Sequence, residues 1–166
     1  MWLSERRAVL TGLLVLPVAA ACGFSPAHAP GGPGAALRGQ VRADDPQTAR
    51  EFAFVAALED LLGRPQAARF ALSHDISVSE SGGARVRPLG DTRFQIFGRV
   101  RFALRDMASD SELYRGTVRN FTAYSATSTQ LATLAAQEDA ERRLMVILAD
   151  QVVARLLAVL PEAVAS

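Results

Sequence analysis

Polar and apolar residues alternate with a period of two through the middle of the chain. Residues 70–79, 93–106 and 112–124 each place apolar side chains opposite polar or charged ones. A period of two is typical of strands that bury one face only. The expected buried face of these strands carries Phe70, Leu72, Ile76, Val78, Phe94, Ile96, Val100, Phe102, Leu104, Tyr114 and Val118.

Before these strands, residues 47–62 repeat apolar positions near the helical period. The run Asp44-Asp45-Pro46 places carboxylates and a proline at the expected start, and Gly63 follows as a typical stop. We therefore expect a helix over residues 47–62. Its expected apolar face comprises Phe54, Val55, Leu58, Leu61 and Leu62.

After the strands, residues 129–160 return to helical spacing, with Ser128 or Thr129 as the cap and Pro161 as the expected end. The expected apolar stripe of this helix comprises Leu131, Leu134, Leu144, Met145, Ile147, Leu148, Val152, Leu156 and Val159.

Residues 37–43 alternate loosely and predict a short first strand, and the glycine-rich residues 81–91 predict a hairpin connection. The element order is therefore β-α-β-β-β-α. We expect an α+β fold in which two helices pack on one face of a four-stranded mixed sheet. The other face of the sheet is then left exposed.

The N-terminus has the form of an export signal. Arg6 and Arg7 precede residues 8–21, an apolar run of 14 residues that is too short to cross a bilayer as a helix. Both the general secretory route and the twin-arginine route fit this pattern.

Two cleavage sites compete in this region. Ala19-Ala20-Ala21-Cys22 resembles a bacterial lipobox, whereas Ala27-His28-Ala29 has the A-x-A form but precedes Pro30. We favour cleavage before Cys22, which predicts acylation of this single cysteine and anchoring in membrane lipid. Gly23 follows Cys22. An acidic residue at this position would favour retention in the inner membrane, so its absence favours the outer membrane. The expected parts are a signal peptide (1–21), a Pro/Gly linker that begins with the lipidated Cys22 (22–36) and a folded domain (37–166).

The charge balance bears on the class of partner. The chain has 18 basic residues, all of them arginine, and 17 acidic ones. Cleavage removes Glu5, Arg6 and Arg7 and leaves 16 of each. A neutral balance argues against a nucleic-acid partner.

The exposed sheet face is expected to gather arginines. If residues 93–106 and 112–124 pair as a hairpin, Arg99 and Arg101 come to lie beside Arg115 and Arg119. Arginine forks bind phosphate in a bidentate manner. Two interpretations carry equal weight: a phosphate-binding surface, or a solvated face neutralised by Asp75 and Glu80.

Catalytic and metal-binding patterns are absent from the sequence. It contains no GxSxG elbow, no HExxH helix and no phosphate-binding glycine loop. Of the two histidines, His28 falls in the linker and His74 on an apolar strand face, where a satisfied, semi-buried histidine is a simpler interpretation than a ligand. We expect no enzyme activity, no cofactor and no metal site.

Three segments together resemble the alphaproteobacterial form of the LptE family of lipopolysaccharide-assembly lipoproteins. They are Cys22-Gly23-Phe24 at the lipobox, the strand end 118–127 (VRNFTAYSAT) and the helix runs 132–140 (ATLAAQEDA) and 144–151 (LMVILADQ). The resemblance implies a lipid-anchored subunit on the periplasmic side of the outer membrane. Such a subunit sits as a plug in the lumen of the LptD β-barrel, assists its assembly and serves lipopolysaccharide delivery.

The resemblance also implies contact with lipopolysaccharide through basic residues, in the hairpin after the second strand and near the start of the last helix. The hairpin offers Arg85 and Arg87, while Ala135 occupies the helix position. The expected lipopolysaccharide contacts are Arg85, Arg87, Arg99, Arg101, Arg115 and Arg119. The alternative hypothesis is a lipoprotein that binds lipid or glycolipid and works alone, facing the periplasm.

Overall fold

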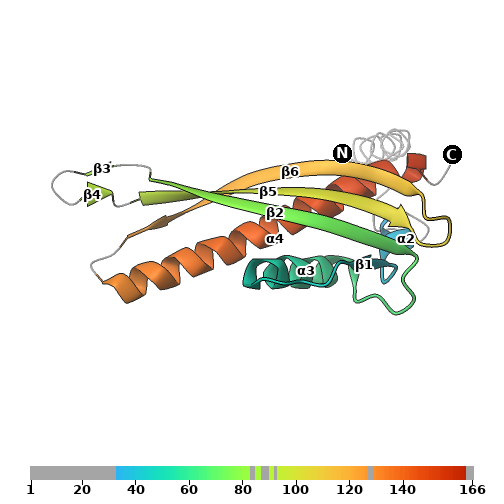
Figure 1. The fold of residues 1–166 in the computed structure, drawn as a ribbon, viewed down its shortest axis with the longest axis horizontal. Helices are drawn as coiled ribbons and strands as arrows, with labels where there is room; N and C mark the ends of the chain where they lie inside the picture. Colours follow the sequence, from blue (N-terminus) through green and yellow to red (C-terminus); the bar gives the residue numbers. More distant parts are fainter. Residues whose placement is uncertain (1–32, 83–84, 87–89, 92, 127–128, 164–166) are drawn as a thin grey trace, which may run out of the picture.

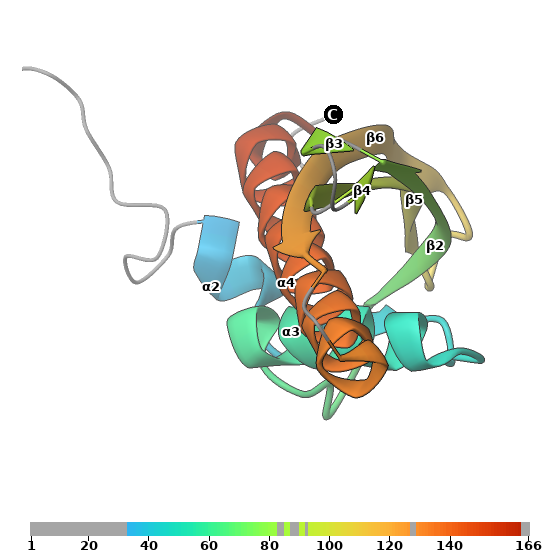
Figure 2. The same cartoon turned by 90° about the vertical axis from the view of Figure 1, so that its left-hand side faces the viewer.

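The computed structural model describes residues 33–82, 85–86, 90–91, 93–126 and 129–163. They form two layers, a long twisted sheet and the helices beneath it, as Figure 1 shows from the side. Viewed along its length in Figure 2, the sheet curves over the helices and leaves its outer face uncovered. The predicted α+β class and the order β-α-β-β-β-α are confirmed.

Four strands build the sheet: β1 (Val41–Ala43), β2 (Phe70–Gly82), β5 (Arg93–Asp106) and β6 (Glu112–Ser125). Their spatial order is β1-β2-β5-β6. Strand β1 pairs parallel to β2, while β2–β5 and β5–β6 are antiparallel, so the sheet is mixed as expected. Between β2 and β5, a small hairpin of β3 (Arg85–Val86) and β4 (Gly90–Asp91) extends from the end of the sheet.

Two long helices, α3 (Ala49–Leu62) and α4 (Gln130–Ala163), lie on the same side of the sheet (Figures 1 and 2). The alternation in the strands points every expected apolar side chain toward them. For example, Ile96, Val100 and Leu104 of β5 are at most 1% exposed, while Arg99 and Arg101 between them are exposed. Burial of this apolar area is the main force that holds the layers together.

The turn between β5 and β6 is fixed by a buried carboxylate. Asp106 is 7% exposed and accepts the backbone N–H of Ala108 at 2.8 Å and the guanidinium N–H of Arg69 at 3.1 Å. The hydrogen bond from Ala108, together with those from Ser109 and Arg69, lowers the pKa of Asp106. The turn leads into the pairing of Arg105 with Glu112, and a shift of one residue between Leu104 and Arg105 gives the register of the remaining β5–β6 pairs.

Helix α3 begins two residues later than the sequence pattern suggested. Its N-cap is Thr48, whose side chain accepts the backbone N–H of Glu51 while the Glu51 carboxylate accepts the N–H of Thr48. This reciprocal capping box gives hydrogen-bond partners to two backbone N–H groups at the start of the helix, where N–H groups have no partner within the helix. Asp44 and Asp45 precede the N-cap by at least three residues and do not take this role. At the other end, the predicted stop at Gly63 is confirmed, with φ at 79°.

A short helix, α2 (Pro33–Leu37), occupies the end of the stretch expected to be linker and the start of the expected first strand. Leu37 is fully buried in the core, and β1 contains only three residues. The folded part therefore includes residues 33–36, which composition alone assigned to a linker. These residues are helical because they lead into Leu37, whose apolar side chain is buried in the core.

Helix α4 differs from the expectation in two ways. It continues through Pro161 to Ala163, so that proline does not end it. Of the expected apolar stripe, Leu131 is 78% exposed, Leu134 is 51% and Ile147 is 36%. The first turns of α4 extend beyond the start of α3 (Figure 1), so no second helix covers them there.

Within the described residues, none of the helices is long and apolar enough to cross a membrane.

Candidate functional site

The uncovered face of the sheet brings the strand arginines together. In the β5–β6 register, Arg99 stands directly opposite Arg119, and Arg101 lies two pairs further along, opposite Thr117. Arg115 is opposite Ala103. The prediction that these four arginines gather on one face is thus confirmed, because all four are exposed on the side away from the helices.

Two of these four arginines are neutralised within the fold. Arg101 Nε donates to Asp75 of β2 at 2.9 Å, and Arg115 Nε donates to Glu112 at 3.0 Å. The hydrogen bond with Arg115 lowers the pKa of Glu112 and raises that of Arg115, so both groups are charged at neutral pH. Asp75 therefore neutralises an arginine of this face, as the sequence analysis expected.

Glu80, the second expected counter-charge, does not reach this face. It follows Val78 on the helix side of β2, and its carboxylate accepts a hydrogen bond from Gln137 of α4 at 3.2 Å. The period-two pattern gives the physical reason, because residues 76, 78 and 80 share one face and residues 75 and 77 share the other.

Arg99 and Arg119 are therefore left as an opposed pair of like charges, with no ion-pair partner among the described residues. Like charges directly opposite each other on two strands are destabilising. An anionic group bound between them would remove this repulsion and accept hydrogen bonds from both guanidinium groups.

Next to this pair lies an aromatic one. Phe97 and Phe121 are also register partners, with ring centroids 5.8 Å apart, and they are 41% and 54% exposed. Large apolar side chains on the open face of a sheet cost free energy in water unless a partner covers them. The sequence placed Phe97 and Phe121 on this face but did not single them out.

The two pairs share one depression of about 510 Å³. Its floor and rim are built from three strands, and the lining residues are Ser77, Val78, Ser79, Phe97, Gly98, Arg99, Arg119, Asn120 and Phe121. A cationic pair beside an apolar pair suits a ligand that is anionic at one end and apolar at the other.

Other expected contact residues are less well placed. Arg85 begins β3 in the small hairpin beyond the sheet, and Arg87 and Cys22 lie outside the described residues. The expected helix position, Ala135, falls in the first turns of α4.

His74 is half-buried against Phe54, with ring centroids 5.3 Å apart. Its Nδ1 is buried without a hydrogen-bond partner among the described residues, so the expectation of a satisfied histidine is wrong for this atom. Burial lowers the pKa of His74, against the opposing effect of the nearby carboxylates, chiefly Asp44. In the part of the chain that the structure describes, no three His, Cys, Asp or Glu side chains converge as metal ligands would.

The described residues thus define a two-layer α+β domain. Its uncovered sheet face carries four exposed arginines, and the two that have no ion-pair partner among the described residues lie beside an aromatic pair. The sequence matches the family model LptE, described as lipopolysaccharide-assembly, over residues 39–156, and the chain belongs to this family. A comparison with curated protein sequences finds no match.

Solved structures of lipoproteins share the fold. A Caulobacter crescentus protein described as a lipoprotein is 20% identical with a TM-score of 0.61, covering 76% of this chain and 93% of its own. Rare lipoprotein B from Shewanella oneidensis is 13% identical with a TM-score of 0.55, covering 72% and 92%. A minor lipoprotein from Acinetobacter baumannii is 14% identical with a TM-score of 0.51, covering 72% and 89%.

Proposed function

We propose that this chain is an outer-membrane lipoprotein subunit of the lipopolysaccharide transport and assembly machinery, a non-enzymatic partner and plug of the LptD barrel. Membership of the lipopolysaccharide-assembly family supports the general role. The sequence ahead of the folded domain supports the anchor, because Cys22 directly follows three small residues at the end of an apolar signal. Multiple acyl chains on Cys22 hold the chain on the periplasmic side of the outer membrane.

The observation that carries a lipopolysaccharide-binding role is the depression shared by Arg99, Arg119, Phe97 and Phe121. Lipid A combines phosphate groups with acyl chains. This surface offers a cationic pair that lies two strand residues, or about 7 Å, from an apolar pair, at a rise of ~3.4 Å per residue. Arg101 and Arg115 border the site, but Asp75 and Glu112 already neutralise them. We therefore assign the primary phosphate contacts to Arg99 and Arg119, ahead of Arg85 and Arg87.

Charge reversal at the opposed pair tests this assignment. Arg99→Glu with Arg119→Glu is expected to weaken binding of lipid A to the mature chain in detergent by at least roughly 10-fold, because each lost charge-assisted hydrogen bond is worth ~1.5–3 kcal/mol. Binding is measured by fluorescence titration, with dephosphorylated lipid A as the ligand control. The matched control is Arg142→Glu with Arg143→Glu on α4, whose arginines pair with Asp139 away from this face. Equal losses in both double variants would contradict the assignment.

The partner role is tested by affinity purification from detergent-extracted membranes. The tagged chain is expected to recover a large outer-membrane β-barrel in a stoichiometric complex. Recovery of inner-membrane or periplasmic proteins alone would refute the assignment.

The lipid anchor is tested by metabolic labelling with palmitate, which is expected to label the natural chain and to fail with Cys22→Ser. Persistent labelling would mean that the signal was misinterpreted.

The alternative of a lipid or glycolipid carrier that works alone predicts a different pair of results. The chain would then bind phosphorylated lipid A through the same arginines but would purify without a barrel. The opposed pair Arg99–Arg119 fits both functions, so the affinity purification separates them.

A further inference from the structure

Strand β6 forms one outer edge of the four-stranded sheet, and among the described residues no strand pairs with its outer side. The backbone N–H of Phe121 donates to the side-chain Oδ1 of its neighbour Asn120 at 2.8 Å, so this N–H points away from β5. Every second residue of an antiparallel strand directs its N–H and C=O to the same side. Thr117 and Arg119 therefore present unpaired donors and acceptors along the same free edge.

This edge borders a groove of about 680 Å³ against the C-terminal half of α4. The groove is lined by Thr117, Val118, Arg119, Gln151, Ala154 and Arg155. Val118 is only 5% exposed and forms its floor. Figures 1 and 2 both show β6 running beside α4 along this stretch. An extended segment that paired with β6 would lie in the groove, with the sheet edge on one side and the helix on the other.

The charge of the lining selects among occupants. Arg119 and Arg155 are exposed, neither has an ion-pair partner among the described residues, and the lining contains no acidic side chain. A second copy of β6 in the groove would place arginines against arginines, which is unfavourable. A lipid phosphate would meet the arginines but would leave the strand N–H and C=O groups without partners. An acidic polypeptide strand satisfies both requirements.

We propose that the outer edge of β6 and the adjoining groove bind an extended acidic segment of a partner protein by β-strand addition. Backbone hydrogen bonds to Thr117 and Arg119 supply the pairing, and Arg155 with Arg119 selects acidic side chains. Asn120 covers the N–H of Phe121, which limits the open stretch of the edge and protects it from unselective pairing. This site shares Arg119 with the proposed lipid A contact but does not use Arg99, and Arg155 belongs to the edge site alone.

The test uses the mature chain in detergent and a fluorescein-labelled ten-residue peptide of alternating threonine and glutamate, followed by anisotropy. The peptide is expected to bind. Thr117→Pro removes an outward N–H without touching the ladder to β5 and is expected to weaken binding at least roughly 10-fold. Arg155→Glu is expected to do the same. The matched control is Arg38→Glu, an exposed arginine of the α2–β1 turn that has no ion-pair partner among the described residues and is expected to bind as the natural chain does.

Peptide variants keep the result interpretable if Thr117→Pro misfolds. A peptide N-methylated at every second residue and a peptide with lysine in place of glutamate are both expected to lose binding. Equal binding by either one, or no binding of the acidic peptide, would overturn the proposal. So would self-association through β6 in sedimentation, or lipid A binding that Arg155→Glu removes. Arg99→Glu separates the two sites, because it is expected to weaken lipid A binding and to leave peptide binding unchanged.

Discussion

Leu148→Asp is expected to abolish the cooperative thermal unfolding transition of the domain. Leu148 is fully buried on α4, facing β5, and its Cδ1 approaches the backbone of Gly98. An aspartate there would bury an unpaired carboxylate and leave a cavity in the core. Such changes cost at least ~4–5 kcal/mol, which is comparable to the ~5–15 kcal/mol by which a domain is stable. Circular dichroism during heating is the measurement.

The neighbouring residue provides the control. Ile147→Asp makes the same change one position along the same helix, but Ile147 is 36% exposed and the new carboxylate can reach water. We expect its transition to remain cooperative, with a midpoint close to that of the natural chain. An unchanged transition in Leu148→Asp would mean that α4 does not pack on the sheet as described.

Gly98→Val is expected to lower the thermal midpoint by on the order of 10 °C, as an overpacking cost of ~1–3 kcal/mol implies for a domain of this size. Gly98 lies in β5, on the face of the sheet that α4 covers. A Cβ atom at this position would come within 2.7 Å of Leu148 Cδ1 and 3.0 Å of Leu144 Cδ2. The helix can approach the sheet this closely because residue 98 has no side chain.

Ala103→Val serves as the comparison for Gly98→Val. It enlarges a half-buried residue of the same strand on the uncovered face of the sheet, which no described helix contacts. Its midpoint is expected to change little, because a β-branched residue suits a strand. A Gly98→Val midpoint equal to that of Ala103→Val would mean that the helix and sheet are not in close contact at residue 98.

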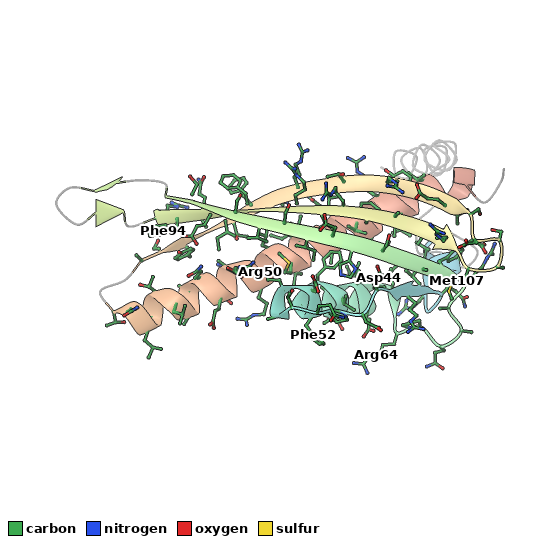
Figure 3. All side chains as sticks on the ribbon, viewed as in Figure 1. Asp44, Arg50, Phe52, Arg64, Phe94 and Met107 are labelled. Carbon is green, nitrogen blue, oxygen red and sulfur yellow. The ribbon has the colours of Figure 1, made fainter. Side chains whose placement is uncertain are left out.

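The contact between the two helices shows a limit of inference from sequence. Arg50 of α3, which Figure 3 labels, donates to Glu141 of α4 at 2.7 Å, across 91 positions of the chain. Nothing in the local pattern around either residue predicts this pair. The start of α3 is a different case, because Thr48 and Glu51 stand at capping-box spacing and were available to sequence reasoning.

The helical stripe of α4 shows a second limit. Leu144, Leu148, Val152 and Leu156 are fully buried as expected, while Leu131 and Leu134 on the same helix are exposed. Helical periodicity identifies the side of a helix that is apolar. It carries no information about how far along the helix a covering element extends.

The sequence by itself determined the face on which each strand residue lies, because side chains of a strand alternate and only one face of this sheet is buried. That rule correctly placed Arg99, Arg101, Arg115 and Arg119 outside and Ile96, Val100 and Leu104 inside. The tertiary structure alone decided the strand order, the register that opposes Arg99 to Arg119, and the neighbours that neutralise Arg101 and Arg115 but not that pair. These properties depend on which distant segments of the chain come into contact. A short periodic pattern carries no information about such long-range contacts.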